Sequence, residues 1–330
     1  MGEYNKRAVL NGAVWKDCNG ETIHAHGGCM LKQDDYFYWY GEDRRDNCYV
    51  SCYRSRDMIH WEFRNHILTT ESRMVPDRVK TQLVLKREDN KKVNLERPKV
   101  LYNKKTKKFV LWAHYENGMN YSEAACAVAT CETPDGDFVY HGHFNPLGYM
   151  SRDCTLFQEA DGTAYFISSA RNNADIHIYR LQEDYMNIDE LTGRLWQGEY
   201  REAPAVFRRE GKLYMLTSYC TGWKPNQGKY AVAENMEGRW SSLEEFGDAT
   251  TYDTQPACVC PIQDGEQTRY LYIADRWDGD NYNNSRYVFL YLEFDSEGKM
   301  LLNYQPEFSS PISAPKGEPT AANAGEQNDK

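Results

Sequence analysis

Four polar residues that could take part in proton transfer recur along the sequence at similar intervals. Glu96, Asp153, Glu202 and Gln255 lie 57, 49 and 53 residues apart, each at the start of a short apolar run. The run after Glu202 reads Ala-Pro-Ala-Val-Phe, and its proline excludes a helix there. A glutamic acid held where a rigid strand begins can donate a proton if a pocket surrounds it.

These residues belong to a structural unit that occurs five times, and alternating apolar and aromatic residues indicate its strands. First strands are expected at 26–31, 97–102, 153–157, 203–207 and 255–260. Second strands follow at 36–41, 109–115, 164–169, 213–219 and 270–275, and third strands at 49–54, 125–130, 176–181, 229–234 and 287–294. Fourth strands are indicated at 61–67, 138–144 and 300–304 but are weak in the third and fourth units. A helix of one or two turns is expected at 184–191.

A period of about 50 residues is typical of four-stranded propeller blades. The sequence therefore predicts an all-β fold, a five-bladed β-propeller with a central channel. The first interval, from His26 to Glu96, is 70 residues long, and we assign the excess to an inserted loop at 69–94. A β-sandwich with an extra domain is the alternative, because strand patterns do not fix topology. We expect residues 1–308 to form the propeller and the polar residues 309–330 a flexible tail.

The composition favours a small neutral ligand. A net charge of −10 argues against a nucleic-acid partner, and no stretch approaches the length of a membrane span. Aromatic residues make up 14%, and their flat rings suit the apolar faces of sugars. The ten cysteines stand singly without a CxxC pair, which indicates reduced thiols. Because no signal peptide is visible, we expect a cytoplasmic protein, or a secreted one if such a segment has been removed. The oligomeric state is not predicted.

In a propeller the first strand of each blade lines the central channel, so residues that open these strands converge at one end. This geometry brings Glu96, Asp153, Glu202 and Gln255 together, with the turn at 24–28 as the contribution of the first blade. Three carboxyl groups around one funnel repel each other, and at least one should have a raised pKa. Glycoside hydrolysis requires such a set, an acid for the leaving oxygen and a second group that activates water.

Seven short stretches carry a resemblance to a known family: residues 25–28 (AHGG), 38–42 (YWYGE), 96–100 (ERPKV), 151–153 (SRD), 201–205 (REAPA), 221–223 (TGW) and 254–255 (TQ). In these stretches the chain resembles glycoside hydrolase family 43. The resemblance extends from about residue 11 to residue 295. The chain is similar in particular to the exo-β-1,3-galactanase branch. The resemblance implies a five-bladed propeller and an inverting hydrolase.

The resemblance also implies roles for the converging residues. Glu202 corresponds to the general acid, and Asp153 to the carboxylate that tunes its pKa and holds it in place. Most of the family has a base Asp at the start of the first blade. Here that turn reads His-Ala-His-Gly and contains no carboxylate, and the galactanase branch shares this absence. In that branch Glu96 and Gln255 are implicated at the water. Gln255 would act through its imidic-acid tautomer, and Glu96 as the base is the rival hypothesis.

Further residues are expected to shape the sugar pocket. Some follow from their place at strand ends and in loops, and Tyr121 matches a substrate-contacting tyrosine of the branch. His24 departs from the Gln common there, and His26 is interpreted as a hydrogen-bonded structural imidazole rather than a metal ligand. The predicted substrate-binding set is Glu42, Tyr121, Thr221, Gly222, Trp223, His24 and His26.

A structural explanation competes with each catalytic assignment. Glu202 could form a buried ion pair with Arg201 or Arg152. Asp153 could pair with Arg152, and Glu96 with Arg97. Gln255 could be a hydrogen-bonded corner before its proline, and Asp253 is an alternative carboxylate at the same corner.

The sequence and the resemblance together predict an inverting exo-glycoside hydrolase that releases terminal galactose from β-1,3-galactan-type oligosaccharides. An inverting acid and base should lie about 6.5–9.5 Å apart. The alternatives are an α-L-arabinofuranosidase or β-galactofuranosidase of the same family, or a sugar-binding propeller without activity. We expect an oligosaccharide as the partner, and no cofactor or metal, since the eight histidines lack metal-ligand spacing.

Overall fold

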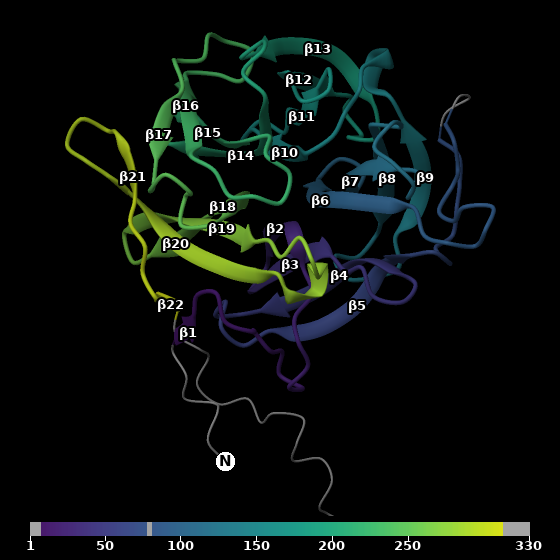
Figure 1. Cartoon of the computed structure of the whole chain (residues 1–330), viewed down its shortest axis with the longest axis horizontal. Helices are drawn as coiled ribbons and strands as arrows, with labels where there is room; N and C mark the ends of the chain where they lie inside the picture. Colours follow the sequence, from purple (N-terminus) through teal and green to yellow (C-terminus); the bar gives the residue numbers. More distant parts are fainter. Residues whose placement is uncertain (1–7, 78–80, 313–330) are drawn as a thin grey trace, which may run out of the picture.

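The computed structural model describes residues 8–77 and 81–312 of the chain. Five four-stranded antiparallel sheets surround a central axis (Figure 1). The strands of each sheet are hydrogen-bonded in sequence order, so one continuous segment forms each blade. No α-helix occurs within the described ranges. The predicted five-bladed β-propeller is confirmed, and the β-sandwich alternative is wrong.

The five blades have the following strands. The first contains β2 (His26–Gln33), β3 (Tyr36–Glu42), β4 (Cys48–Ser55) and β5 (Glu62–Thr69), and the second β6 (Asn94–Asn103), β7 (Lys108–Glu116), β8 (Ala125–Cys131) and β9 (Val139–Phe144). The third contains β10 (Cys154–Gln158), β11 (Ala164–Ala170), β12 (Asp175–Leu181) and β13 (Ile188–Leu195). The fourth contains β14 (Arg201–Arg209), β15 (Lys212–Tyr219), β16 (Gly228–Ala233) and β17 (Glu244–Phe246), and the fifth β18 (Gln255–Asp264), β19 (Gln267–Arg276), β20 (Arg286–Phe294) and β21 (Met300–Leu302). Two 3₁₀ turns, η1 (Pro146–Gly148) and η2 (Tyr282–Asn284), lie in loops, and β1 (Ala8–Leu10) pairs with β22 (Glu307–Ser309).

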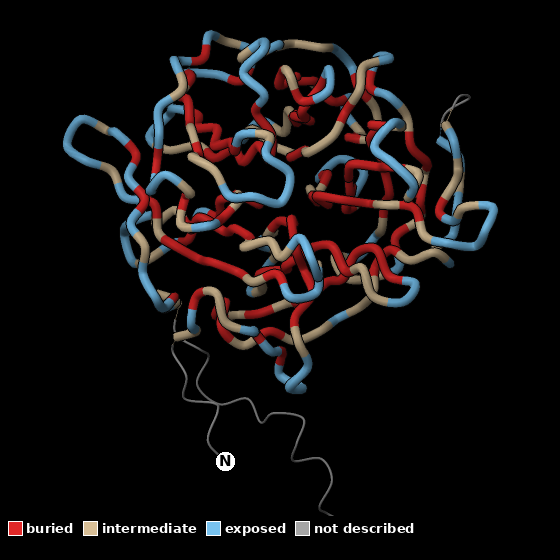
Figure 2. The backbone as a smooth tube through the Cα atoms, viewed as in Figure 1, coloured by how far each residue is buried: buried red, intermediate tan, exposed pale blue. Residues whose placement is uncertain are grey.

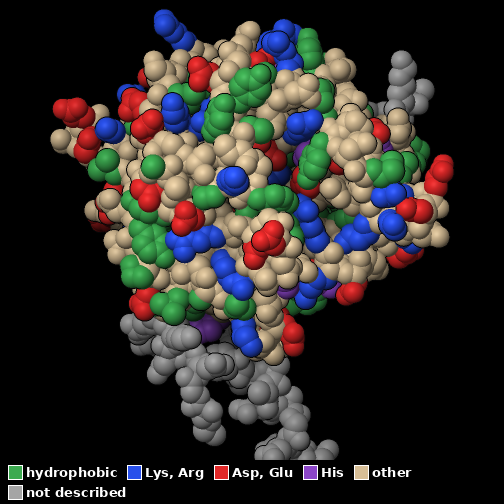
Figure 3. Space-filling view, viewed as in Figure 1, with side chains coloured by type: hydrophobic (Ala, Val, Ile, Leu, Met, Phe, Trp, Pro, Cys, Tyr) green, Lys and Arg blue, Asp and Glu red, His purple; other side chains and the backbone are tan. Residues whose placement is uncertain are grey.

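The first strand of every blade lies nearest the axis, and these strands contact one another in the ring order β2, β6, β10, β14, β18 (Figure 1). Buried residues follow the strands, whereas exposed residues gather in the peripheral loops (Figure 2). Large aromatic side chains such as Trp39, Trp112 and Tyr272 are fully buried. Flat rings therefore provide much of the sheet packing. On the face seen in Figure 3, acidic and basic side chains are interspersed rather than gathered by sign.

A β-bulge lies within the first few residues of several first strands. The register shifts after His26 in β2, after Glu96 in β6 and after Glu202 in β14. The next residues have positive φ angles, +58° at Gly27, +55° at Arg97 and +52° at Ala203. Bulges re-aim side chains next to active sites. In the first blade the close approach also requires glycine, since a Cβ at Gly28 would lie 1.7 Å from the carbonyl oxygen of Tyr40.

Two secondary-structure expectations need comment. The helix expected at 184–191 is wrong, because residues from Ile188 onward form β13, the outer edge of the third blade. Its polar residues face solvent, and this obscures the strand pattern. The insertion predicted at 69–94 lies along β9, where the backbone N–H of Val75 donates to Tyr140 (2.9 Å) and that of His143 to Gln82 (3.0 Å). Residues 78–80 of the insertion are outside the described ranges.

The ends of the propeller meet at β1 and β22. Ser309, the first residue of the predicted tail, pairs with Ala8 in this sheet. Residues 313–330 are not described, so the flexible tail stays a prediction. Residues 8–77 and 81–312 contain no helix long and apolar enough to cross a membrane. All ten cysteines lie in the described ranges, none of them forms a disulfide there, and seven are buried.

Candidate active site

A cavity of about 240 Å³ lies where the five blades converge. Side chains from every blade line it: Glu42, Arg44, Glu96, Arg97, His114, Tyr121, Arg152, Asp153, Asn173, Glu202, Cys220, Gly222, Trp223, Gln255 and Trp277. The four residues predicted to converge are all in this set. Asp253, the alternative carboxylate at the last corner, is exposed and does not line the cavity.

Glu202 is a buried carboxyl group held by two side-chain amides. Its Oε2 accepts a hydrogen bond from Asn173 Nδ2 (2.9 Å), and its Oε1 accepts one from Gln255 Nε2 (3.0 Å). Arg201, the competing ion-pair partner, instead donates to Thr217. Burial, and next the negative charge of Asp153, raise the pKa of Glu202 to about 8. The group is therefore protonated at neutral pH, as a general acid must be.

Asp153 lies beside the guanidinium of Arg97, with 3.3 Å between Oδ2 and Nε. Arg97 is buried and is fixed by a hydrogen bond from Nη2 to the carbonyl of Pro256 (2.8 Å). The competing partner Arg152 instead donates to the carbonyl of Tyr121 (3.0 Å). An ion pair between the buried Arg97 and the partly exposed Asp153 therefore adjoins the acid, and Asp153 still acts on Glu202 through its charge.

Glu96 has the opposite electrostatic environment. Its Oε1 accepts from Arg44 Nη2 (3.0 Å) and the hydroxyl of Tyr121 (2.8 Å), and its Oε2 lies 3.3 Å from His114 Nδ1. Burial alone would raise the pKa of Glu96, but His114, Arg44 and Tyr121 lower it to about 2. The expected competitor, Arg97, faces Asp153 instead. Glu96 is therefore an ionised carboxylate at neutral pH.

Gln255 is held by three hydrogen bonds. Its Nε2 donates to Glu202 and to Ser218 Oγ (2.9 Å), and its Oε1 accepts from Trp277 Nε1 (2.8 Å). An indole N–H can only donate, which fixes the amide oxygen toward Trp277 and the amide nitrogen toward Glu202. The 3.0 Å contact places Gln255 beside the acid. That is closer than the 6.5–9.5 Å expected of an inverting pair.

Most of the predicted substrate-binding residues lie at this cavity. Glu42 is buried, and its Oε2 accepts from Arg44 (3.0 Å) and from the hydroxyl of Tyr282 (2.8 Å). Tyr121 and Trp223 are each 43% exposed and form the rim, next to Gly222. Thr221 is not among the lining residues, and its hydroxyl donates to the carbonyl of Lys224.

His24 and His26 are outside the lining, so their assignment to sugar contact does not fit this geometry. The Nδ1 of His26 lies 2.8 Å from Asp275 Oδ1, and its ring stacks on Tyr287. These contacts agree with the structural interpretation of His26. His24 is buried, and burial lowers its pKa to about 4. The first blade contributes Glu42 and Arg44 to the cavity instead of the turn at 24–28.

Sequence reasoning missed Arg44, His114, Asn173, Cys220 and Trp277. All five lie on the second strand of a blade or just after it, a place that the hairpin register brings to the cavity and that apolar patterning does not mark. His114 pairs directly with Glu96 in β7. Cys220 and Trp277 follow two residues after Ser218 and Asp275, the register partners of Glu202 and Gln255.

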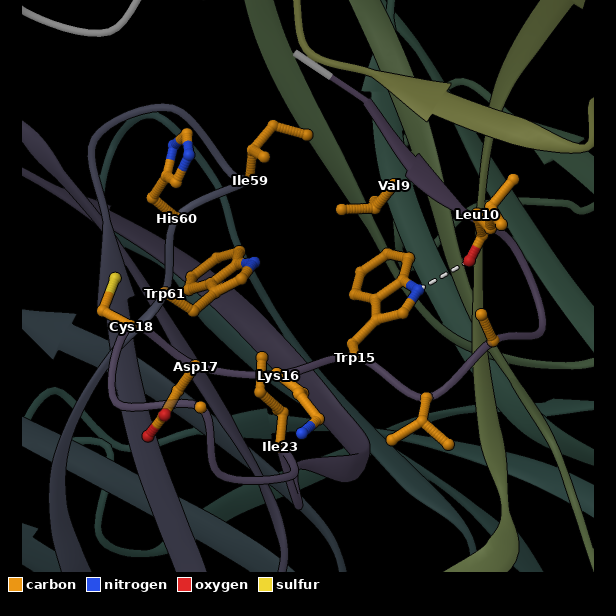
Figure 4. Close-up of a pocket in the computed structure, with 13 residues that line it drawn as sticks. Val9, Leu10, Trp15, Lys16, Asp17, Cys18, Ile23, Ile59, His60 and Trp61 are labelled. Carbon is orange, nitrogen blue, oxygen red and sulfur yellow. Dashed lines mark hydrogen bonds between the residues drawn. The ribbon is translucent and has the colours of Figure 1, made fainter. Parts of the chain in front are cut away.

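A second cavity, of about 260 Å³, lies beside the N-terminal strand. Figure 4 shows Trp15 and Trp61 on either side of it, with Val9 and Ile59 above them. The indole of Trp15 donates to the carbonyl of Leu10 (2.7 Å). Among the described residues of its lining, Asp17 is the only carboxylate, and it accepts hydrogen bonds from the backbone N–H groups of residues 19 and 21.

One group within the described ranges has side chains close enough for a metal, namely Asp43, Cys48 and His66 within 4.8 Å. Arg45 already forms an ion pair with Asp43 (2.7 Å), and burial raises the pKa of Cys48 to about 12. A paired carboxylate and a protonated thiol are poor ligands. The absence of a metal and of a cofactor stays a prediction.

A five-bladed propeller with a protonated glutamic acid and ionised carboxylates at its axis has the site of a glycoside hydrolase. The sequence profile described as Glycosyl hydrolases family 43 matches residues 100–246. A comparison with curated proteins gives no match.

Solved structures of galactanases and galactosidases are similar over most of the chain. An exo-β-1,3-galactanase from Clostridium thermocellum is 43% identical, with a TM-score of 0.85, and the match covers 93% of this chain and 68% of that one. An exo-β-1,3-galactanase from Phanerochaete chrysosporium, solved with β-1,3-galactotriose, is 31% identical (93% and 69% covered, TM-score 0.81). A GH43 β-1,3-galactosidase is 33% identical (92% and 63% covered, TM-score 0.80). This chain belongs to glycoside hydrolase family 43 and is of the exo-β-1,3-galactanase-like branch.

Proposed function

We propose that the protein releases terminal galactose from β-1,3-linked galacto-oligosaccharides, with inversion at the anomeric carbon. The observation that carries this proposal is the buried, protonated Glu202 beside Asp153, in a chain 43% identical to an exo-β-1,3-galactanase. A small cavity enclosed by five blades suits the end of a chain rather than an internal segment.

In the proposed reaction Glu202 gives its proton to the glycosidic oxygen as the bond from that oxygen to the anomeric carbon breaks. A water molecule attacks the same carbon from the opposite face and gives a proton to the general base, for which Gln255 and Glu96 are the two candidates. The products are α-galactose and an oligosaccharide shorter by one unit. Glu42 and Arg44 are available for hydrogen bonds to sugar hydroxyls, with Trp223 and Tyr121 at the entrance.

Two residues compete for the role of holding the water. Gln255 contacts Glu202 directly, so the substrate must separate them before Gln255 can act across the sugar. Glu96 is ionised, but its low pKa makes it a weak base. Azide distinguishes the two in the variants Glu96→Ala and Gln255→Ala with an aryl β-galactoside. Azide should restore turnover and yield α-galactosyl azide only where the base has been removed.

The function is tested by incubating the protein with β-1,3-galactobiose and following the products by proton NMR. The proposal expects α-galactose as the first anomer. An aryl α-L-arabinofuranoside and an aryl β-galactofuranoside serve as controls for the alternative activities. Release of β-galactose first, or faster hydrolysis of either control substrate, would contradict it. No turnover of any substrate would instead favour the sugar-binding alternative.

A further inference from the structure

Two buried side chains beside the proposed site connect Glu96 to the loop that carries Tyr121. His114 and Glu116 lie on β7, and their side chains are 1% and 0% exposed. His114 Nδ1 lies 3.3 Å from Glu96 Oε2, and its Nε2 lies 2.9 Å from Glu116 Oε1. The three residues therefore form a continuous carboxylate–imidazole–carboxylate chain that leads away from the cavity.

The second oxygen of Glu116 holds the end of the loop at 117–124. Glu116 Oε2 accepts hydrogen bonds from the backbone N–H groups of Glu123 (3.0 Å) and Ala124 (3.1 Å). Ala124 has a φ of +40°, a conformation that a non-glycine residue adopts only where its surroundings impose it. The same loop carries Tyr121, whose hydroxyl donates to Glu96 Oε1 (2.8 Å). Glu116 thus acts on both oxygens of Glu96, through His114 on one and through the loop on the other.

The geometry also favours a charged imidazole. His114 Nε2 is at hydrogen-bond distance from Glu116 Oε1 (2.9 Å) and its Nδ1 is at ion-pair distance from Glu96 Oε2 (3.3 Å), so each ring nitrogen has a carboxylate beside it. The groups that face His114 are Glu96 from β6, Glu116 from β7 and the ring of Tyr121, whose centroid lies 5.9 Å away. Although burial would lower the pKa of His114, the two carboxylates raise it to about 9. One buried cation therefore stands between two buried anions, and Arg44 provides a second cation for Glu96.

We propose that Glu116 and His114 are positioning residues that keep Glu96 ionised and oriented and that set Tyr121 at the entrance of the cavity. This inference deepens the proposed function and rests on it only in assuming that Glu96 acts on substrate.

The test uses Glu116→Gln and His114→Gln in the full chain. A glutamine at 116 can accept on one atom only, so either His114 or the loop loses its partner. We expect kcat/KM to fall about 10- to 100-fold, because Glu96 is misplaced. The acid limb of the pH profile of kcat/KM should also move to higher pH by about one unit or more, because Glu96 loses a cation within about 4 Å.

The matched control is His177→Gln, which replaces a buried imidazole on β12 that bonds to the hydroxyl of Tyr179 (3.0 Å) and does not line the cavity. This variant should lose thermal stability without moving the acid limb. If Glu116→Gln and His114→Gln also lose thermal stability without moving the acid limb, the two residues are merely structural and the proposal is overturned.

Nitrogen-15 NMR of the histidine rings gives a readout that does not depend on the substrate. The parent protein at pH 8 should show a doubly protonated imidazole whose signals disappear in His114→Gln. A neutral His114 at that pH would overturn the proposal even if both variants failed to fold. Conversely, the protein could show the doubly protonated ring and yet hydrolyse no galactoside. That result would contradict the proposed function but not the charged His114 between Glu96 and Glu116.

Discussion

At the scale of single residues, the buried acid Glu202 makes the free energy of unfolding depend on pH. Its pKa is raised from 4.5 to about 8 in the fold, so the protonated form contributes its full stabilisation below pH 4.5. It is lost as the pH rises toward 8, where Glu202 ionises without a cation in direct contact. The protonated state that the proposed reaction needs is therefore also the state in which Glu202 favours folding.

Replacing Glu202 by Gln should lower kcat for β-1,3-galactobiose by about 10²- to 10⁴-fold, because the amide cannot donate the proton. The variant should fold, since the unpaired Oδ1 of Asn173 can accept from the new amide once Asn173 rotates. Its melting temperature should exceed that of the parent increasingly from pH 4.5 to 8 in thermal unfolding scans. A constant difference in melting temperature across this range would contradict the pKa assignment.

The charge of Asp153 should be visible in the basic limb of the pH profile. This charge raises the pKa of Glu202, so Asp153→Asn should lower that pKa and leave Arg97 without its anion. We expect the basic limb of kcat/KM for an aryl β-galactoside to move down by about one pH unit. The control is Glu159→Gln, which removes a carboxylate paired with Arg208 (2.6 Å) away from the cavity. An equal shift in both variants would argue against a specific effect of Asp153.

At the scale of elements, the bulge after Glu202 aims the acid at the axis. Ala203 is fully buried with a φ of +52°, which costs an alanine about 1–2 kcal/mol.

Ala203→Gly should relieve this strain and keep activity. Ala203→Val should destabilise the fold by about 1–3 kcal/mol and lower kcat, because a β-branched side chain disfavours the bulge. Denaturant unfolding and initial rates measure both effects, with Ala160→Val in an exposed turn as the control. If the Ala203→Val variant were active and stable, the bulge would not be what aims Glu202.

The elements also explain which parts of the site could be predicted from the sequence. The convergence of Glu96, Asp153, Glu202 and Gln255 follows from the repeat alone, because first strands line the axis of any propeller. His114 and Trp277 could not be recognised in the same way. Their place in the cavity depends on the bulges, which shift the hairpin register and leave no signal in apolar patterning. The polar edge strand β13 was misjudged for a related reason, since a solvent-facing strand has no apolar face to alternate.

At the scale of the whole molecule, the blades are continuous in sequence, so the ring is closed by contacts between its first and last segments rather than by a shared blade. Near the axis the hydroxyl of Tyr287 accepts from the N–H of Ala25 (2.7 Å), and His26 bonds to Asp275. At the periphery β1 pairs with β22. The sequence predicted five units but not this closure, because the pairing of β1 and β22 joins residues about 300 positions apart in two three-residue strands.

Asn11 is the polar side chain on which this closure most depends. Its Nδ2 donates to the carbonyls of Phe289 (3.0 Å) and Gln305 (2.9 Å), and its Oδ1 accepts from the N–H of Phe289 (2.8 Å). Asn11→Ala leaves the buried N–H and carbonyl of Phe289 without this partner and should destabilise the fold by about 2–4 kcal/mol. Activity at 25 °C should persist, since the cavity lies at the axis. Thermal unfolding with Asn303→Ala, which removes only an exposed bond to Glu293, provides the comparison. If Asn11→Ala lost activity while still folded, the closure would have to be coupled to the site, and the blades could not be treated as a rigid ring.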